Sequence, residues 1–303
     1  MKLGVALPQI GDWAKPDNVI KIAKKAEGAG YNSLWVQERL LWPLEPKKPY
    51  PATPDGHLPD VYQFVLDPIV SLTYAAANTE NIRIGTGIIN LPYHTPAVLA
   101  KQLATLDLIS RGRLDFGIGL GWSEDEYIAT NVPFKNRGDR VDEFLRCILN
   151  LWTEEVSEFD GTFYKVPKSI VNPKPVQKPH PPITVGGFNP RTFERGVVLG
   201  NGYNGIIMPF GQMKGVIGGL KTAAEKSGRK FSELQIVCRG FTTITDQSPG
   251  EQRFPLIGTI NEIKDDLKHF EEMGITEIFF EFNFVPHITI EKVFTYMDKL
   301  APR

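Results

Sequence analysis

Short apolar runs alternate along the chain with longer stretches in which apolar residues recur at the spacing of a helix face. The first apolar run covers residues 2–7 and stops at a proline, which predicts a buried strand. A helix is predicted next, with Pro16 at its first position and with Gly28 and Gly30 closing it. A second strand is predicted at residues 33–36. The apolar face of the intervening helix holds Val19, Ile20, Ala23 and Ala26.

The same alternation predicts eight strands in all, separated by helix-like sequence. Because these runs are continuously apolar, they are typical of the strands of a parallel sheet covered by helices. Eight such strands close into a (β/α)8 TIM barrel, so we expect an α/β fold of this kind, with residues 1–303 as a single domain. A doubly wound open sheet is the alternative fold. The strands are predicted at residues 2–7, 33–36, 82–86, 114–118, 183–185, 205–207, 234–237 and 277–280.

Helix starts are also visible in the sequence. Thr95-Pro96 suits the N-cap and the first position of one helix. Capping boxes are predicted over 123–126 and 259–262, because a hydroxyl residue stands three positions before a glutamate in each. Apolar residues at helical spacing predict amphipathic helices over 141–149 and 290–300.

The connections at residues 39–64, 153–182 and 241–258 are longer than most loops in a compact domain. They follow the carboxyl ends of strands or lie near them, apart from a portion of the second connection, and this end of a barrel is where active sites lie. We therefore expect lids or substrate walls at the carboxyl-terminal face, with disordered surface insertions as the alternative.

Composition and charge narrow the class of partner. The 34 Lys and Arg nearly cancel the 35 Asp and Glu, which argues against binding to nucleic acid or to an anionic membrane surface. The first 30 residues lack the features of a signal peptide, and no apolar run approaches the roughly 20 residues of a membrane span. We expect a cytoplasmic protein.

The sequence contains no motif for metal binding or for hydrolysis. Cys147 and Cys238 stand alone and suggest free thiols in the core, and the five histidines lack the spacing of metal ligands. The motifs of P-loop nucleotide hydrolases, zinc proteases and common serine hydrolases do not occur. No metal site is therefore expected.

Charged residues at strand ends are candidates for catalysis. Glu38 and Arg39 follow the second strand, where a barrel directs side chains toward its ligand, although a surface ion pair between them is an alternative. His94 follows the third strand and is placed on the same face. Farther along, Arg137 and Arg140 either bind an anionic ligand tail or pair with the acids at 139 and 142.

Glycines mark two further strand ends. The run 117–121 resembles a dinucleotide fingerprint, but Trp122 replaces its third glycine, so a Rossmann fold is disfavoured. These glycines indicate a close approach of the backbone to a flat ligand or to a neighbouring strand. Gly186 and Gly187 end the fifth strand, and their amides are available for an anion such as phosphate, with a tight turn as the alternative.

Several stretches together resemble the luciferase-like monooxygenase superfamily, and within it the branch of oxidoreductases that use coenzyme F420, a deazaflavin. The stretches cover much of residues 80–205, with an earlier block at residues 41–51. They are 84–88 with 91–96, 102–107 with 110–114, 117–122, and 173–176 with 180–187. The combination is more specific than any one motif.

The resemblance implies a TIM barrel in which the cofactor ring stacks over a bulge after the third strand. In relatives this bulge contains a non-proline cis peptide, which falls here at Gly87-Ile88. The phosphate of the cofactor is implied to meet Gly186 and Gly187. The cofactor-binding residues implied by the resemblance are Thr86, Gly87, Ile88, Gly121, Trp122, Gly186 and Gly187.

The chain also departs from the pattern of its relatives. Relatives often place a histidine where Arg39 stands here, and arginine cannot donate a proton near neutral pH. We therefore expect Arg39 to stabilise negative charge, with Glu38 orienting it and His94 as the third catalytic candidate. Trp122 stands where the sugar-phosphate dehydrogenase branch has an acid, which disfavours that substrate. The aromatic residues that suggest an apolar pocket wall are Trp13, Trp42, Tyr50 and Trp122.

The function expected from these observations is hydride transfer between coenzyme F420 and a small organic substrate. An FMN-dependent monooxygenase of the same superfamily is the alternative, and a flavin-binding protein without turnover is the second alternative. A homodimer is expected because relatives are commonly dimers.

Overall fold

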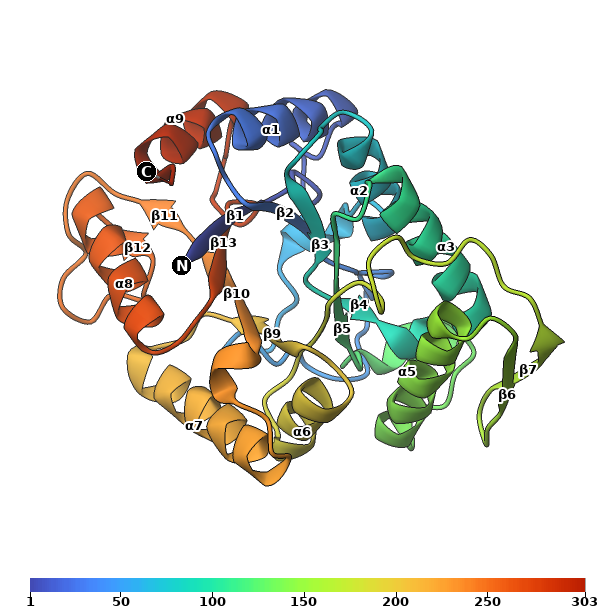
Figure 1. The fold of residues 1–303 in the computed structure, drawn as a ribbon. Coiled ribbons are helices and arrows are strands. Elements are labelled where there is room, and N and C mark those ends of the chain that lie inside the picture. The colour runs from blue at the N-terminus through green and yellow to red at the C-terminus, as the bar shows by residue number, and fades with distance from the viewer. Residues whose placement is uncertain (303) are drawn as a thin grey trace.

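The computed structural model describes residues 1–302, and eight parallel strands form a closed barrel at its centre (Figure 1). The strands follow one another in chain order, and the ring closes where the last strand pairs with the first. The predicted (β/α)8 TIM barrel is confirmed, and the open doubly wound alternative is wrong. The strands are β1 (Lys2–Ala6), β2 (Ser33–Val36), β3 (Arg83–Thr86), β5 (Leu114–Gly119), β8 (Ile183–Val185), β9 (Gly202–Ile206), β10 (Gln235–Phe241) and β13 (Glu277–Glu281).

The predicted strand positions agree with the structure to within one residue except at β10, which continues to Phe241 beyond the predicted end at residue 237, and at β9. That strand begins at Gly202, ahead of the predicted start at residue 205, and Gly202 pairs with Gln235 of β10. Glycine and asparagine interrupt the apolar pattern there, so the sequence gives no strand signal although the backbone continues the ladder.

Helices surround the barrel, one or more after most strands (Figure 1). The apolar face predicted over 141–149 is buried in α5, and the two cysteines are free and buried as predicted. The α-helices are α1 (Pro16–Gly28), α2 (Pro68–Ala76), α3 (Pro96–Ile109), α4 (Glu124–Ala129), α5 (Arg137–Thr153), α6 (Pro190–Val198), α7 (Phe210–Lys226), α8 (Ile260–Glu272) and α9 (Ile290–Leu300). Among residues 1–302, no helix has both the length and the apolar composition needed to cross a bilayer.

The predicted caps form to different extents. The Thr259 and Glu262 side chains bond reciprocally to each other's backbone, so this capping box is confirmed. Ser123 accepts from the amide of Glu126, but the carboxylate of Glu126 bonds elsewhere, so the reciprocal half of that box is wrong. Thr95 and Pro96 occupy the N-cap and the first position of α3 as predicted, but the Thr95 side chain makes no capping hydrogen bond.

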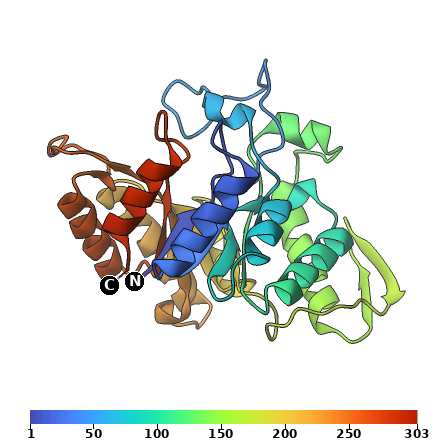
Figure 2. The same cartoon turned by 90° about the horizontal axis from the view of Figure 1, so that it is seen from above.

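The long connections contain structure of their own. The chain after β2 rises over the carboxyl-terminal end of the barrel and includes a short 3₁₀ helix, η1 (Asp60–Gln63) (Figure 2). The connection after α5 forms an antiparallel pair, β6 (Ser157–Asp160) and β7 (Lys165–Ser169). The connection after β10 forms the short parallel pair β11 (Thr243–Ile244) and β12 (Ile257–Gly258).

Candidate active site

A bulge after β3 is the centre of the candidate site. Thr86 and Ile89 are buried, whereas Gly87 and Ile88 between them are partly exposed. The bulge is fastened to β2, because Gly87 N donates to Val36 O at 2.6 Å and Glu38 N donates to Ile88 O at 3.2 Å. The chain then returns to β5 through the two-residue strand β4 (Ile89–Asn90). The Gly87-Ile88 peptide bond is cis, as expected.

Thr86 supports the bulge from beneath. Its fully buried hydroxyl donates to Gly117 O at 2.7 Å and accepts from Gly117 N at 2.9 Å. Asn204 of β9 donates to Thr86 O at 3.2 Å. The Thr86 side chain is therefore committed to the barrel wall, and its contribution to the site is to hold Gly87 and Ile88 in place.

The glycine run after β5 allows close packing of the backbone. A Cβ on Gly117 would overlap the carbonyl oxygen of Thr86, and one on Gly119 would overlap the Ile88 side chain. A Cβ on Gly121 would overlap the Tyr93 hydroxyl, and Gly121 has a positive φ of 78°. The sequence left open whether these glycines approach a flat ligand or a neighbouring strand. Gly117 and Gly119 approach the end of β3 and the bulge that follows it.

Gly186 and Gly187 differ in the state of their amides. Gly186 N donates to Ile118 O at 2.7 Å, so the expectation of two bare amides is wrong for this residue. The amide of Gly187 has no acceptor within residues 1–302, and Gly187 immediately precedes the loop into α6. A Cβ on Gly187 would lie 2.7 Å from Thr192 Oγ1, and its φ of 138° favours glycine.

Glu38 anchors His94 rather than Arg39. Its Oε1 lies 2.6 Å from His94 Nε2, and its Oε2 accepts from Asn90 N at 2.7 Å. Glu38 is 7% exposed and pairs with His94, whereas Arg39 pairs with Glu126, so the alternative of a surface ion pair between Glu38 and Arg39 is wrong. The expectation that Glu38 orients Arg39 is wrong, because both carboxylate oxygens of Glu38 are bound by His94 and Asn90.

Arg39 is held instead by Glu126 of α4. Its Nη1 lies 3.2 Å from Glu126 Oε1, and the side chains of both residues are more than nine-tenths buried. The same carboxylate oxygen accepts from Leu40 N at 2.7 Å and from Leu41 N at 3.1 Å. Glu126 thus fixes the direction of the chain after β2. The sequence indicated it only as a capping residue, because its partners are distant in the chain.

An aromatic wall encloses the Arg39 guanidinium. The guanidinium carbon lies 4.9 Å from the Trp122 ring centroid and 5.5 Å from that of Tyr62. Tyr50 packs against both rings, and burial raises the pKa of its hydroxyl above the ordinary value. Of the aromatic residues suggested for a pocket wall, Tyr50 and Trp122 lie here with Trp42 close by. Trp13 belongs instead to the main core beneath.

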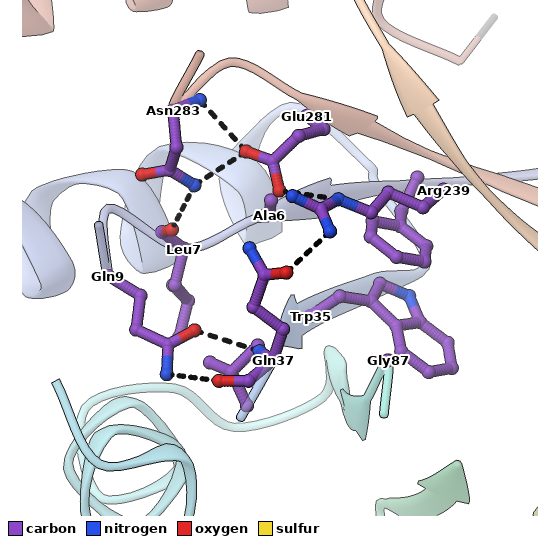
Figure 3. A pocket seen from close by; sticks show the side chains of 11 residues that line it. Ala6, Leu7, Gln9, Trp35, Gln37, Gly87, Arg239, Glu281 and Asn283 are labelled. Atoms are coloured by element: carbon purple, nitrogen blue, oxygen red, sulfur yellow. Dashed lines mark hydrogen bonds and ion pairs between the residues drawn. The ribbon is translucent and has the colours of Figure 1, made fainter. Parts of the chain in front are cut away.

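A polar cluster at the carboxyl ends of β1, β2, β10 and β13 was missed in the sequence (Figure 3). Arg239 Nε donates to Glu281 Oε2 at 3.0 Å, and Arg239 Nη1 donates to Gln37 Oε1. Burial alone would lower the pKa of Arg239, but Glu281 and other neighbours raise it, so the guanidinium stays charged. Charged residues ending the apolar runs 234–238 and 277–280 were the available signal. The cluster consists of Gln9, Gln37, Arg239, Glu281 and Asn283.

The expected partners of Arg137 and Arg140 are bound by other arginines. Arg191 and Arg195 of α6 pair with the acids at 139 and 142, so the structural pairing considered for Arg137 and Arg140 is wrong. Arg137 lies 4.1 Å from the Phe134 ring centroid, and Arg140 lies 4.5 Å from that of Phe163. Within the described 302 residues, no group of three or more His, Cys, Asp or Glu is arranged to hold a metal ion.

Comparison with known proteins gives the following relatives. The family model described as luciferase-like monooxygenase matches residues 2–251. An uncharacterized protein of Mycobacterium tuberculosis is 41% identical over 165 residues, which are 54% of this chain and 58% of that protein. This match therefore spans little more than half of either chain.

Solved structures share the whole fold at low sequence identity. An F420-dependent secondary alcohol dehydrogenase in complex with an F420-acetone adduct has a TM-score of 0.79 at 15% identity, covering 99% of this chain and 97% of that one. The FMN-bound oxygenating constituent of 3,6-diketocamphane monooxygenase from Pseudomonas putida has a TM-score of 0.76 at 16% identity, covering 100% and 98%. The family match covers residues 2–251, and the barrel agrees with it. The chain therefore belongs to the luciferase-like monooxygenase family of oxidoreductases.

Proposed function

We propose that this protein binds coenzyme F420 over the Gly87-Ile88 bulge and exchanges hydride with a small organic substrate that bears a carbonyl or alcohol group. The observation that carries the proposal is the partly exposed bulge, braced by β2 and β5, beside the buried Glu38–His94 pair. The resemblance of residues 84–96 and 117–122 to the F420-dependent branch favours the deazaflavin.

The residues present fit a flat, anionic cofactor. Gly87 and Ile88 provide an exposed surface without a bulky polar side chain, and the space beside Gly186 is narrow, since a Cβ there would lie 3.0 Å from Asn204 O. The free amide of Gly187 is available to a phosphate. Gly138 faces Arg191 in the first turn of α6, so the first turn of α5 lies beside that of α6.

Arg137 and Arg140 therefore stand near the proposed phosphate position without carboxylate partners of their own. We assign them to the anionic tail of the cofactor. Their stacking on Phe134 and Phe163 holds the guanidinium groups while leaving the charge uncompensated.

His94 and Glu38 are assigned to proton transfer. Bound F420 supplies the hydride acceptor or donor. Reduction of a carbonyl also requires one proton at its oxygen, and oxidation of an alcohol requires its removal. With His94 Nε2 bound to Glu38, Nδ1 is the ring nitrogen left to exchange that proton. Arg39, packed against Trp122 and Tyr62, is assigned to hold a positive charge near the developing oxyanion.

The test is equilibrium binding of F420 and of FMN, each oxidised and reduced, to the purified protein, followed by hydride exchange with ketones and alcohols. Selective binding of F420 that is lost in Gly187→Ala, with turnover of a carbonyl substrate, supports the proposal. Selective binding of FMN with oxygen consumption would instead establish the monooxygenase. Binding of a cofactor without electron exchange with any substrate would favour the second alternative, a flavin-binding protein without turnover.

A further inference from the structure

Two buried hydrogen-bond donors beside the bulge have no acceptor. They are Gln37 Nε2 and Arg239 Nη2, and no described residue accepts from either. Both side chains line one narrow hollow, and Gly87 forms part of its wall (Figure 3). A buried donor left without an acceptor costs about 1–3 kcal/mol, so an oxygen atom placed between these two donors would be stabilised by both.

Neighbouring contacts fix which atoms are free. Gln37 Oε1 accepts from Arg239 Nη1 and lies 3.3 Å from the Tyr62 hydroxyl that donates to it, so the amide nitrogen is the free end. The Arg239 guanidinium carbon lies 4.6 Å from the Phe241 ring centroid and 5.0 Å from that of Phe284. The two rings lie 5.2 Å from each other, so the guanidinium packs against both on one side. These contacts and the hydrogen bonds of Nε and Nη1 limit the movement of the free nitrogen.

The charges around the two free donors favour a neutral acceptor over an anionic one. Glu281 compensates Arg239, and its other oxygen accepts from the backbone and side-chain nitrogens of Asn283 at 2.8 and 2.6 Å. Arg239 and Glu281 are 7% and 2% exposed. A carboxylate would bring an unbalanced negative charge into this buried cluster, whereas a carbonyl oxygen would accept both hydrogen bonds without changing the net charge.

We propose that Gln37 and Arg239 form a binding site for a neutral carbonyl oxygen. This proposal rests on the proposed function for the role of the site, because Gly87 joins the hollow to the bulge. The oxygen has two chemical sources, the carbonyl of the substrate or a ring carbonyl of the cofactor. Either source requires Gln37, Arg239 and nearby side chains to shift enough to admit it, since the free nitrogens are buried.

The decisive variant is Gln37→Glu. It retains an oxygen for Arg239 and Tyr62 but replaces the donor with a second carboxylate oxygen, which repels a carbonyl. Gln212→Glu, on the exposed start of α7, makes the same chemical change away from the site. Arg239→Lys is a second test, since it keeps a positive charge for Glu281 and removes Nη2.

Acetamide and acetate are suitable ligands, because they have the same shape and differ in charge. Saturation-transfer NMR on the protein alone should show tighter binding of acetamide. Gln37→Glu and Arg239→Lys should weaken it at least about tenfold, and Gln212→Glu should not. If Gln37→Glu also weakens F420 or FMN about tenfold and acetamide competes with the cofactor, the oxygen belongs to the ring. If cofactor affinity is unchanged and acetamide binds the cofactor complex, the oxygen belongs to the substrate.

The proposed carbonyl site would be overturned if acetate bound as tightly as acetamide. It would also be overturned if Gln37→Glu and Arg239→Lys left the binding of every ligand unchanged. Failure of the wild-type protein to bind either cofactor would overturn the proposed function but leave the acetamide result to stand by itself. The two proposals are thereby tested separately.

Discussion

His94 and Glu38 come from different strand ends and meet at 2.6 Å. The His94→Gln variant should lower the rate of hydride exchange by about 10²- to 10⁴-fold, because it keeps a hydrogen-bond donor for Glu38 but cannot transfer a proton. Cofactor affinity should stay within about twofold, since the bulge is unchanged. Stopped-flow oxidation of the reduced cofactor by a ketone measures the rate. His269→Gln, on the exposed face of α8, is the matched control. An equal loss in both variants would exclude the assignment.

The Glu126 carboxylate is the counter-ion of Arg39 and also accepts hydrogen bonds from two backbone amides after β2. Glu126→Ala would leave Arg39 as a buried charge without a counter-ion and two backbone amides without an acceptor. We expect a loss of about 3 kcal/mol in the free energy of unfolding, measured by urea titration.

Glu124→Ala is the control in the same short helix. The Glu124 side chain is 36% exposed and lies 3.5 Å from Lys48, an exposed pair whose loss should cost less than about 1 kcal/mol. Equal losses for the two variants would show that Glu126 does not stabilise the chain after β2 in this way.

At the scale of elements, glycines decide how closely β5 and the bulge can pack. Gly117→Ala should destabilise the protein by about 3 kcal/mol or more, because its Cβ would overlap Thr86 O and the Asn204 side chain in the wall of the barrel. Gly215→Ala in α7 meets nothing within 4 Å and should stabilise by about 0.5–1 kcal/mol through helix propensity. Thermal and urea unfolding measure the change in the free energy of unfolding for each alanine variant, and the two changes should have opposite signs.

The capping box of α8 should make the free energy of unfolding depend on pH. Hydrogen bonds from Ser248 and Thr259 lower the pKa of Glu262 to about 2 from its ordinary value of 4.5. A lowered folded-state pKa contributes stability that is present above the unfolded pKa and is lost as the pH falls toward 2. The wild-type protein should therefore lose more unfolding free energy between pH 5 and pH 2 than Glu262→Gln does. Parallel slopes in urea titrations across this range would contradict the assignment.

Element prediction worked where local pattern and final environment agree. The strand at 183–185 and the capping box at 259–262 have strong local signals, and both form as expected. The start of β9 and the bond of Glu126 are set by partners far along the chain. No local propensity reports those partners, because register and side-chain pairing depend on which strands are neighbours.

At the scale of the whole molecule, the proposed cofactor should couple to global unfolding. A ligand that binds the folded chain alone stabilises it by about 2.7 kcal/mol at a free concentration of 100 times its Kd. We therefore expect F420 to raise the midpoint of thermal unfolding in proportion to the logarithm of its concentration. Gly187→Ala should remove this dependence, because the added Cβ disturbs the proposed phosphate position beside Thr192. No shift with F420 and a clear shift with FMN would favour the monooxygenase.

The candidate site was only partly predictable for the same physical reason. Glu38, Arg39 and His94 could be placed near the carboxyl ends of the second and third barrel strands, because each lies within a few residues of such a strand in the sequence. Their pairing could not, since Glu38 turns toward His94 and Arg39 toward Glu126. Arg239 and Glu281 were missed because a single charge at the end of an apolar run gives no indication of its partner.

The sequence by itself determined the alternation of strands and helices, the number of barrel strands, the ends at which polar residues gather and the likeness to an oxidoreductase family. These features depend on local periodicity, on turn-forming residues and on the chirality of strand–helix–strand connections. The tertiary structure alone decided which charges pair, which amides stay free and where two buried donors lack an acceptor. Those outcomes depend on distances between residues that are far apart in the chain, and closure of the barrel sets these distances.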